Sequence, residues 1–181
     1  MELVDKYLDN FFKSNIKDYM QSESYIKLNS VQLDMINKMH RQKGSIHIKP
    51  RSSGKTTAII SHIIYSSTIG DCYSFIYVSS KKENNIEVER KIRELASHSK
   101  LSIESTRNST IYFMTYREEP PPYSLSSKSY IYFDDIVPLK WNQDYRILED
   151  FQKVICTFSP MANINIEQMY SPSLEIIESL S

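Results

Sequence analysis

The feature that most constrains this chain is residues 46–57, which read Ile-His-Ile-Lys-Pro-Arg-Ser-Ser-Gly-Lys-Thr-Thr. Residues 46–48 predict a short apolar strand, and the residues up to Gly54 predict a tight loop. The apolar residues that follow from Ala58 onward predict a buried helix. Backbone N–H groups in such a loop and at the start of such a helix are unpaired donors in a positive potential, so they bind phosphate. The segment therefore predicts a phosphate-binding loop between a strand and a helix.

We expect the phosphates to lie against six consecutive residues: Ser52, Ser53, Gly54, Lys55, Thr56 and Thr57. Lys55 can reach the β- and γ-phosphates of a nucleotide as a point charge, and the Thr56 hydroxyl can hold Mg²⁺. Gly54 lets the backbone approach the phosphate closely. The match to G-x-x-x-x-G-K-[ST] is incomplete, because Lys49 stands at the first glycine. The prediction therefore depends on the flanking strand and helix as much as on Gly-Lys-Thr.

A second feature is the run Tyr-Ile-Tyr-Phe at residues 130–133, which is followed directly by Asp134 and Asp135. Aromatic and β-branched residues predict a buried strand. Ligands of open α/β sheets bind at the carboxyl ends of the strands. We expect Asp134 to hold the Mg²⁺ shell and Asp135 to orient or deprotonate the attacking water. The alternative is that these residues only form a turn at a strand end.

Predicted strands and helices alternate along the rest of the chain. We expect strands at residues 46–48, 73–79, 101–104, 110–116, 130–133 and 154–158, the last of these being the final core strand. We expect helices at residues 3–20, 29–42 (ended by Gly44), 56–67, 83–98 and near 144–151, with a helical remainder after 158. This alternation predicts an α/β fold with a mostly parallel central sheet that helices flank on both faces.

Composition restricts the setting of the protein more than its activity. Lys plus Arg and Asp plus Glu number 22 each, so a nucleic-acid role cannot be argued from net charge and any basic surface must be local. Cys72 and Cys156 lack paired spacing and are expected to be buried thiols in a reducing compartment. No apolar run approaches the roughly 20 residues of a membrane span, and the N-terminus does not resemble a signal peptide. A cytosolic or nuclear protein without a membrane partner is expected.

Four landmarks in order, over residues 28–161, resemble the ATPase domain of the large terminase subunit, the viral and phage DNA-packaging motor of the P-loop NTPase superfamily. That family carries an arginine three residues before the P-loop glycine, where Arg51 stands, and an upstream glutamine that contacts adenine, where Gln32 stands. Residues 107–113 look similar to the strand pair before its acidic motif, and residues 156–160 (Cys-Thr-Phe-Ser-Pro) to its coupling motif.

The resemblance implies a RecA-like P-loop NTPase core of the ASCE type at residues 28–181, with an N-terminal helical extension at 1–27 and no nuclease domain. It implies an ATPase that uses ATP and Mg²⁺ and moves double-stranded DNA into a viral capsid. Arg51 would sense the γ-phosphate in cis, Gln32 would bind adenine, and Thr157 would couple hydrolysis to movement, as would Ser159. Implied partners are a homo-oligomeric ring and a portal, capsid or other packaging subunit. The location would be the cytoplasm or nucleus of an infected host cell, or the virion.

One departure from the family bears on activity. The family usually has Asp-Glu where this chain has Asp134-Asp135, and the second acid is therefore one methylene shorter. A misplacement of about 1 Å can cost roughly a hundredfold in rate, so weak hydrolysis is expected. Two alternatives stay open: a helicase-like ATPase half, and a catalytically degenerate relative that serves in assembly or structure.

Several residues have a structural interpretation beside the functional one. Asn29 and Gln32 have capping-box spacing, Arg51 fits a solvated loop residue, and Thr157 fits a polar strand end. Residues 81–93 contain cations that could face DNA phosphates. Glutamates are interleaved with them, which favours a helix with i,i+4 ion pairs. The histidines lack metal-ligand spacing, and the scattered tyrosines favour core packing over base stacking.

Overall fold

The computed structural model describes residues 27–69, 74–98, 110–118, 128–136, 151–159 and 175–178. Its helices are α2 (Ser30–Arg41), α3 (Lys55–Ile69) and α4 (Lys82–His98). Its strands are β1 (Gly44–Ile48), β2 (Ser74–Ser79), β3 (Thr110–Thr115), β4 (Ser129–Asp134), β5 (Lys153–Phe158) and β6 (Glu175–Glu178). The helix expected at 3–20, the strand at 101–104, most of the helix near 144–151, and Cys72 lie outside these ranges.

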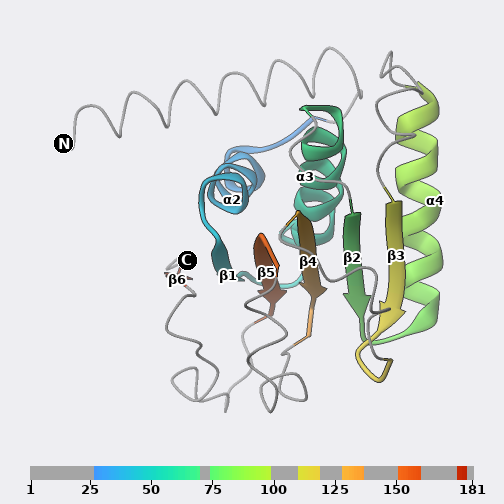
Figure 1. Ribbon diagram of the computed structural model, residues 1–181. Coiled ribbons are helices and arrows are strands. Elements are labelled where there is room, and N and C mark those ends of the chain that lie inside the picture. Colours follow the sequence, from blue (N-terminus) through green and yellow to red (C-terminus); the bar gives the residue numbers. More distant parts are fainter. Residues whose placement is uncertain are drawn as a thin grey trace.

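The strands form one parallel sheet in the order β3-β2-β4-β5-β1-β6. The arrows of β2, β3, β4 and β5 accordingly point the same way in Figure 1. β5 lies between β1, which leads into the loop at residues 49–54, and β4, which ends in Asp134. Because the strands are parallel, their carboxyl ends meet at one edge of the sheet, and the parallel sheet predicted from the sequence is confirmed.

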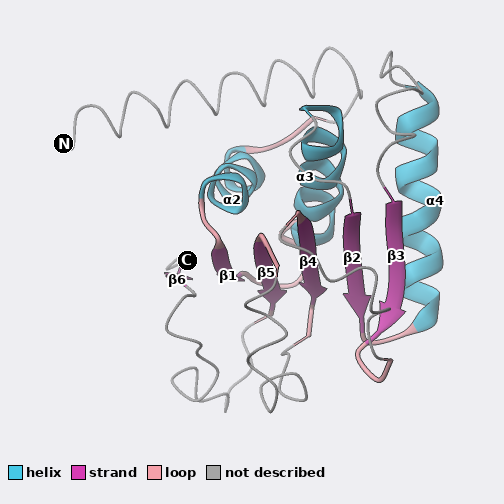
Figure 2. Cartoon of the chain, in the orientation of Figure 1, coloured by secondary structure: helices cyan, strands magenta, loops and turns pink. Residues whose placement is uncertain are grey.

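The helices α2, α3 and α4 pack on one face of the sheet (Figure 2). Side chains of successive strand residues point to opposite faces, so Tyr130 and Tyr132 join the helices in one apolar cluster. Ile131 and Phe133 point the other way and pack in a second cluster, to which none of the three helices contributes. Helices were expected on both faces, and within the described part of the chain they cover one.

Some predicted element bounds are wrong. Gly44 does not end the second predicted helix: α2 ends at Arg41, its C-cap Gln42 is extended, and Gly44 is the first residue of β1. Residues 175–178 are not helical but form β6, which pairs in parallel with β1 and places two isoleucines opposite Ile46 and His47. Residues 154–158 therefore do not form the final strand. The branched side chains of those isoleucines favour a strand, and periodicity over so short a run cannot separate it from a helix.

The buried side of α4 is shifted from the expected one. In the sequence, Ile86, Ile92 and Leu95 are the residues expected to form the thin apolar side of the helix at 83–98, but Ile86 is 60% exposed. Ile92 is buried as expected, and Asn85 and Val88 are buried with it, at a spacing of three and then four residues. Asn85 accepts a hydrogen bond from the Ser79 hydroxyl at 2.6 Å, so a polar residue with a buried partner takes part in the buried side of the helix.

The free thiol of Cys156 is buried in β5, as expected, and burial raises its pKa to about 12. Among the described helices, none has both the length and the apolar character needed to cross a bilayer.

Candidate functional site

The loop between β1 and α3 has two residues in the left-handed backbone region, Ser52 at φ 63° and Gly54 at φ 84°. The N–H of Ser53 donates to the carbonyl of Pro50 at 3.3 Å, and the N–H of Ala58 donates to that of Gly54 at 2.9 Å. These bonds close the loop onto the first turn of α3. The N–H groups at the start of a helix lack helical acceptors, so the loop and the helix together have the geometry that suits an anion.

Gly54 cannot be replaced without displacing a neighbour, because a Cβ atom there would lie 2.1 Å from Nε2 of Gln32. Gln32 itself caps α2. Its N–H donates to Oδ1 of Asn29 and its Oε1 accepts from the N–H of Asn29, both at 2.9 Å. The capping-box interpretation is therefore confirmed. The same amide packs against the loop, and adenine binding by Gln32 stays a prediction.

Lys55 is buried and connects the loop to the end of β5. Its ammonium donates to Oγ of Ser159 at 3.0 Å and to the carbonyls of Lys49 and Pro50 at 3.3 Å and 3.2 Å. It lies 3.9 Å from Oδ1 of Asp135. The ammonium thus stands between the loop at residues 49–54 and the second acidic residue.

The carboxylate of Asp134 is buried and accepts hydrogen bonds from three hydroxyl groups. Thr56 and Tyr77 donate to Oδ2, each at 2.6 Å, and Thr157 donates to Oδ1 at 2.8 Å. Burial, together with the charge of Asp134, raises the pKa of Tyr77 and keeps the phenol protonated. In the sequence, Tyr77 stands out only as one residue of the strand predicted at 73–79. Its contact with Asp134 follows from the register between β2 and β4, and that register can be predicted only when the order of the strands in the sheet is known.

Asp135 follows β4 with φ at 54°, in the left-handed region, and its side chain is 51% exposed. Its Oδ1 accepts from both the N–H and the hydroxyl of Ser159, each at 3.0 Å. Its own N–H donates to Oγ1 of Thr157 at 3.5 Å. The structure therefore brings the two residues expected in the coupling motif, Thr157 and Ser159, against the two acids.

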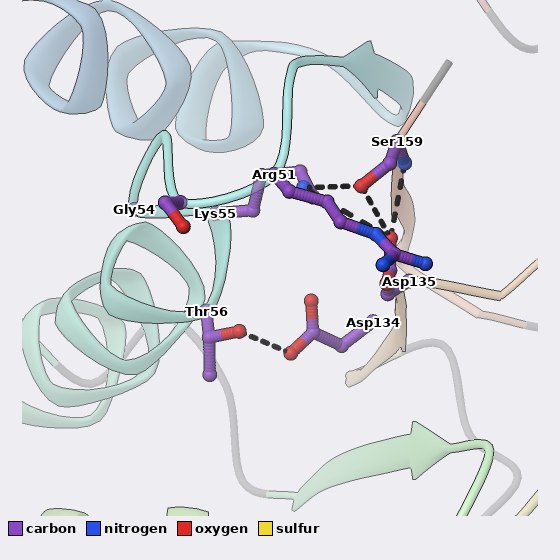
Figure 3. A pocket seen from close by; sticks show the side chains of 8 residues that line it. Arg51, Gly54, Lys55, Thr56, Asp134, Asp135 and Ser159 are labelled. Atoms are coloured by element: carbon purple, nitrogen blue, oxygen red, sulfur yellow. Dashed lines mark hydrogen bonds and ion pairs between the residues drawn. The ribbon is translucent and has the colours of Figure 1, made fainter. Parts of the chain in front are cut away.

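These groups surround one cavity of about 280 Å³, shown in Figure 3. It is lined by Arg51, Ser52, Gly54, Lys55, Thr56, Asp134, Asp135 and Ser159. Gln32 lies behind Gly54, and Thr157 behind Asp134, so neither lines the cavity directly. Ser53 and Thr57 also lie outside the lining. The Ser53 hydroxyl oxygen is buried without a hydrogen-bond partner among the described residues.

No known protein family matches the sequence, and no curated protein matches it significantly. Solved structures do match. The chain is similar to the UvsW helicase of bacteriophage T4, with a TM-score of 0.66, 13% identity, and coverage of 98% of this chain and 77% of that one. It is similar to the HK97 bacteriophage large terminase, with a TM-score of 0.64, 10% identity, and coverage of 83% and 38%. The corresponding values for a DEAD box protein from Methanococcus jannaschii are 0.58, 15%, 90% and 52%.

The fold is that of a RecA-like P-loop ATPase. The ATPase domain of the Thermus phage P74-26 large terminase shares it, with a TM-score of 0.54, 13% identity and coverage of 81% of this chain and 70% of that one. At these identities the likeness concerns the fold alone. The terminase-like fold expected from the four sequence landmarks is confirmed.

The oxygen donors at this P-loop fit a magnesium–nucleotide complex. The Thr56 hydroxyl and the Asp134 carboxylate are already paired, and Mg²⁺ prefers oxygen ligands that include one or two carboxylates and substrate phosphates. No group of three or more His, Cys, Asp and Glu side chains suited to a metal occurs in the described ranges. This arrangement fits a metal ion that takes most of its oxygen ligands from bound phosphate. The Lys55 ammonium at the same cavity fits a phosphate group as well.

Three cations of α4, Arg90, Lys91 and Arg93, form ion pairs along the helix. Arg90 pairs with Glu87 at 3.0 Å and with Glu94 at 2.8 Å, and Arg93 pairs with Glu89 at 2.7 Å. Hydrogen bonds from Arg90, and then Lys91, lower the pKa of Glu87 to about 2. The interpretation of this helix as one with ion pairs three and four residues apart is confirmed, and DNA contact by these residues stays a prediction.

Proposed function

We propose that this chain is an ATP-binding and ATP-hydrolysing motor domain, similar to that of large terminases, which moves double-stranded DNA into a viral capsid. The observation that carries the proposal is the convergence of four side chains on one cavity: Lys55, Thr56, Asp134 and Asp135. They come from the P-loop and from the strand two positions away across the sheet, with β5 between. A binding module for an anion alone would not need the two acids.

In this proposal Lys55 binds the β- and γ-phosphates, and the backbone N–H groups at Ser52, Ser53, Gly54 and Thr57 bind the remaining phosphate oxygens. Thr56 and Asp134 would hold Mg²⁺. When bound, the ion would neutralise charge on the phosphate oxygens. Ligand binding would replace the present contacts of Lys55 with Ser159 and the loop carbonyls, because the ammonium has only three donor positions.

Asp135 is the proposed residue for the attacking water. Its half-exposed side chain lines the cavity, and its Oδ1 is fixed by two hydrogen bonds from Ser159. A carboxylate fixed in this way can accept a proton or a hydrogen bond from water at the γ-phosphate. Because the side chain of Asp135 is one methylene shorter than that of glutamate, we expect hydrolysis to be slow.

Three further roles follow the resemblance. Arg51 is an exposed residue at the cavity and would contact the γ-phosphate in cis. Gln32 would contact adenine from the start of α2, beside Gly54. Thr157 touches both acids and would transmit the state of the phosphate to β5.

The partners belong to the same proposal: double-stranded DNA, a homo-oligomeric ring and a portal or capsid protein, in the cytoplasm or nucleus of an infected host cell or in the virion. The order of landmarks over residues 28–161 and the likeness in fold to the HK97 and P74-26 large terminases support it. Residues 1–27 would form a helical extension to the ATPase core at 28–181.

The test is ATP turnover with Mg²⁺, measured without DNA, with duplex DNA and with single-stranded DNA. The motor proposal predicts turnover that duplex DNA raises and that Lys55→Ala abolishes. Absence of turnover in the wild type, with gain in Asp135→Glu, would instead indicate a nucleotide-binding relative that has lost hydrolysis. Absence of nucleotide binding in all three proteins would contradict the enzymatic proposal and leave an assembly or structural protein on this fold.

A helicase-like ATPase half is the second candidate. The observation that favours it is the fold likeness to the T4 UvsW helicase, which extends over 98% of this chain. Preferential stimulation by single-stranded DNA, together with strand separation of a tailed duplex, would support this candidate over the packaging motor.

A further inference from the structure

Tyr77 lies inside β2, away from both the P-loop and the acidic residues in sequence, yet its hydroxyl reaches the site. It donates to Oδ2 of Asp134 at 2.6 Å, the oxygen to which Thr56 also donates at 2.6 Å. The chain thus supplies a phenol to the carboxylate expected to hold Mg²⁺. Neither the Gly-Lys-Thr motif nor the acidic motif accounts for that contact.

The sheet register explains how the two residues meet. Ser79 is the residue of β2 that pairs with Asp134, and Tyr77 pairs with Tyr132. Residues two apart on a strand share a face, so Tyr77 and Asp134 both point to the face that carries α3. The long aromatic side chain of Tyr77 spans the offset of two residues and brings its oxygen to the carboxylate.

The ring of Tyr77 is held in place by its surroundings. The side chain is 1% exposed, and the ring of Phe113 on β3 packs against it with the centroids 5.9 Å apart. A carboxylate only accepts hydrogen bonds, so the phenol must be the donor. A buried donor in a packed ring has few alternative positions, and therefore it restricts rotation of the Asp134 carboxylate.

We infer that Tyr77 is a positioning residue that orients the Asp134 carboxylate for Mg²⁺ in the nucleotide complex. The inference rests on the proposed function, since it takes Thr56 and Asp134 as the protein groups that hold the ion. Thr157 fixes Oδ1 and Tyr77 fixes Oδ2, so each oxygen has a hydroxyl donor besides Thr56. Partners of metal-binding groups set their orientation and strongly affect metal affinity.

The experiment compares the wild type with Tyr77→Phe, which removes one oxygen and keeps the ring. Binding of a fluorescent ATP analogue is measured in EDTA and then across a Mg²⁺ titration. We expect the Mg²⁺ concentration at half-maximal enhancement of binding to rise about tenfold. The dissociation constant in EDTA should stay within about twofold, because Tyr77 lies outside the cavity lining.

The matched control is Tyr132→Phe. Tyr132 is also fully buried on the same face, and its hydroxyl bonds to Nδ1 of His62 at 2.8 Å rather than to the site. Loss of a buried phenol oxygen should lower thermal stability in both variants, while only Tyr77→Phe should shift the Mg²⁺ midpoint. Equal midpoints in the wild type and Tyr77→Phe would overturn the inference and leave the proposed function intact. A wild type that binds no nucleotide with or without Mg²⁺ would overturn both.

Discussion

Thr157 donates its hydroxyl proton to Oδ1 of Asp134 at 2.8 Å, directly across two paired parallel strands. The same oxygen atom of Thr157 accepts from the N–H of Asp135 at 3.5 Å. One buried hydroxyl on β5 therefore contacts both acidic residues at the end of β4. Since β5 also pairs with β1, this hydroxyl lies between the two halves of the site.

Replacing Thr157 by Val should therefore affect both stability and coupling. The variant leaves Oδ1 of buried Asp134 without this donor, which should lower the free energy of unfolding by about 1–3 kcal/mol in urea titrations. We also expect duplex DNA to stimulate ATP turnover less in Thr157→Val than in the wild type. Thr157→Ser keeps the hydroxyl and is the control. If Thr157→Ser and Thr157→Val lose stimulation equally, the hydroxyl is not the coupling group.

Lys55→Ala should abolish nucleotide binding, with a loss of at least about a hundredfold in affinity by fluorescence titration, because it removes the buried cation of the cavity. Lys82→Ala is the matched control, since that lysine is exposed at the start of α4 and lies outside the cavity lining. Retention of affinity in Lys55→Ala would place the nucleotide elsewhere.

Asp135→Asn should separate chemistry from binding. The amide keeps the size of the side chain and can still accept from Ser159, but it is a poor proton acceptor. We expect ATP turnover to fall by about 10²–10⁴-fold, the usual contribution of a general base. Nucleotide affinity, measured in parallel, should change by less than about threefold. A parallel loss of affinity would argue that Asp135 binds the ligand rather than the water.

Gly54→Ala should lower the free energy of unfolding for two separable reasons. Its φ of 84° disfavours a side chain by about 1–2 kcal/mol, and the new Cβ would collide with the amide of Gln32. Adding Gln32→Ala removes the collision but not the backbone strain. Urea unfolding of the two single variants and the double variant should therefore show a smaller total loss than the sum of the single losses. Strict additivity would show that the Gln32 amide is not what limits this position.

Two buried histidines should make the fold sensitive to acid. Burial lowers the pKa of His47 to about 3, with the nearby charges of Lys38 and Lys49 contributing, and burial also lowers that of His62. As the pH falls, the unfolded chain, with histidine pKa values of about 6.5, binds protons before the folded chain does. The contribution of these histidines to the free energy of unfolding is therefore fully present above pH 6.5 and is lost as the pH decreases toward 3.

Once the pH is below 6, the free energy of unfolding should fall by about 1.4 kcal/mol per pH unit for each histidine. Urea unfolding of the wild type and His47→Gln at pH 7.5, 6 and 5 would measure it. The variant should lose less stability than the wild type over that range. An identical pH dependence would show that the acid sensitivity arises from other groups.

Local patterns predicted the elements that carry the site, because the strand before Lys55 and the strand before Asp134 are both short, apolar and bounded by polar residues. They could not predict the contact of Tyr77 with Asp134, which depends on strand order. They also missed β6, since four residues are too few for periodicity to separate a strand from a helix. Ile86 was misplaced because the buried side of α4 includes a polar residue, Asn85, which accepts a hydrogen bond from Ser79, and apolar spacing alone does not reveal it.

The position of β5 between β1 and β4 makes the site depend on chain length as well as on residue identity. Alternate residues of β5 face opposite sides of the sheet, so inserting or deleting one residue before Thr157 would present Cys156 or Phe158 to Asp134. Both carboxylates would lose their shared hydroxyl in a single step, although every side chain that lines the cavity remained in the sequence. Length changes in this strand should therefore be tolerated less well than most single substitutions within it.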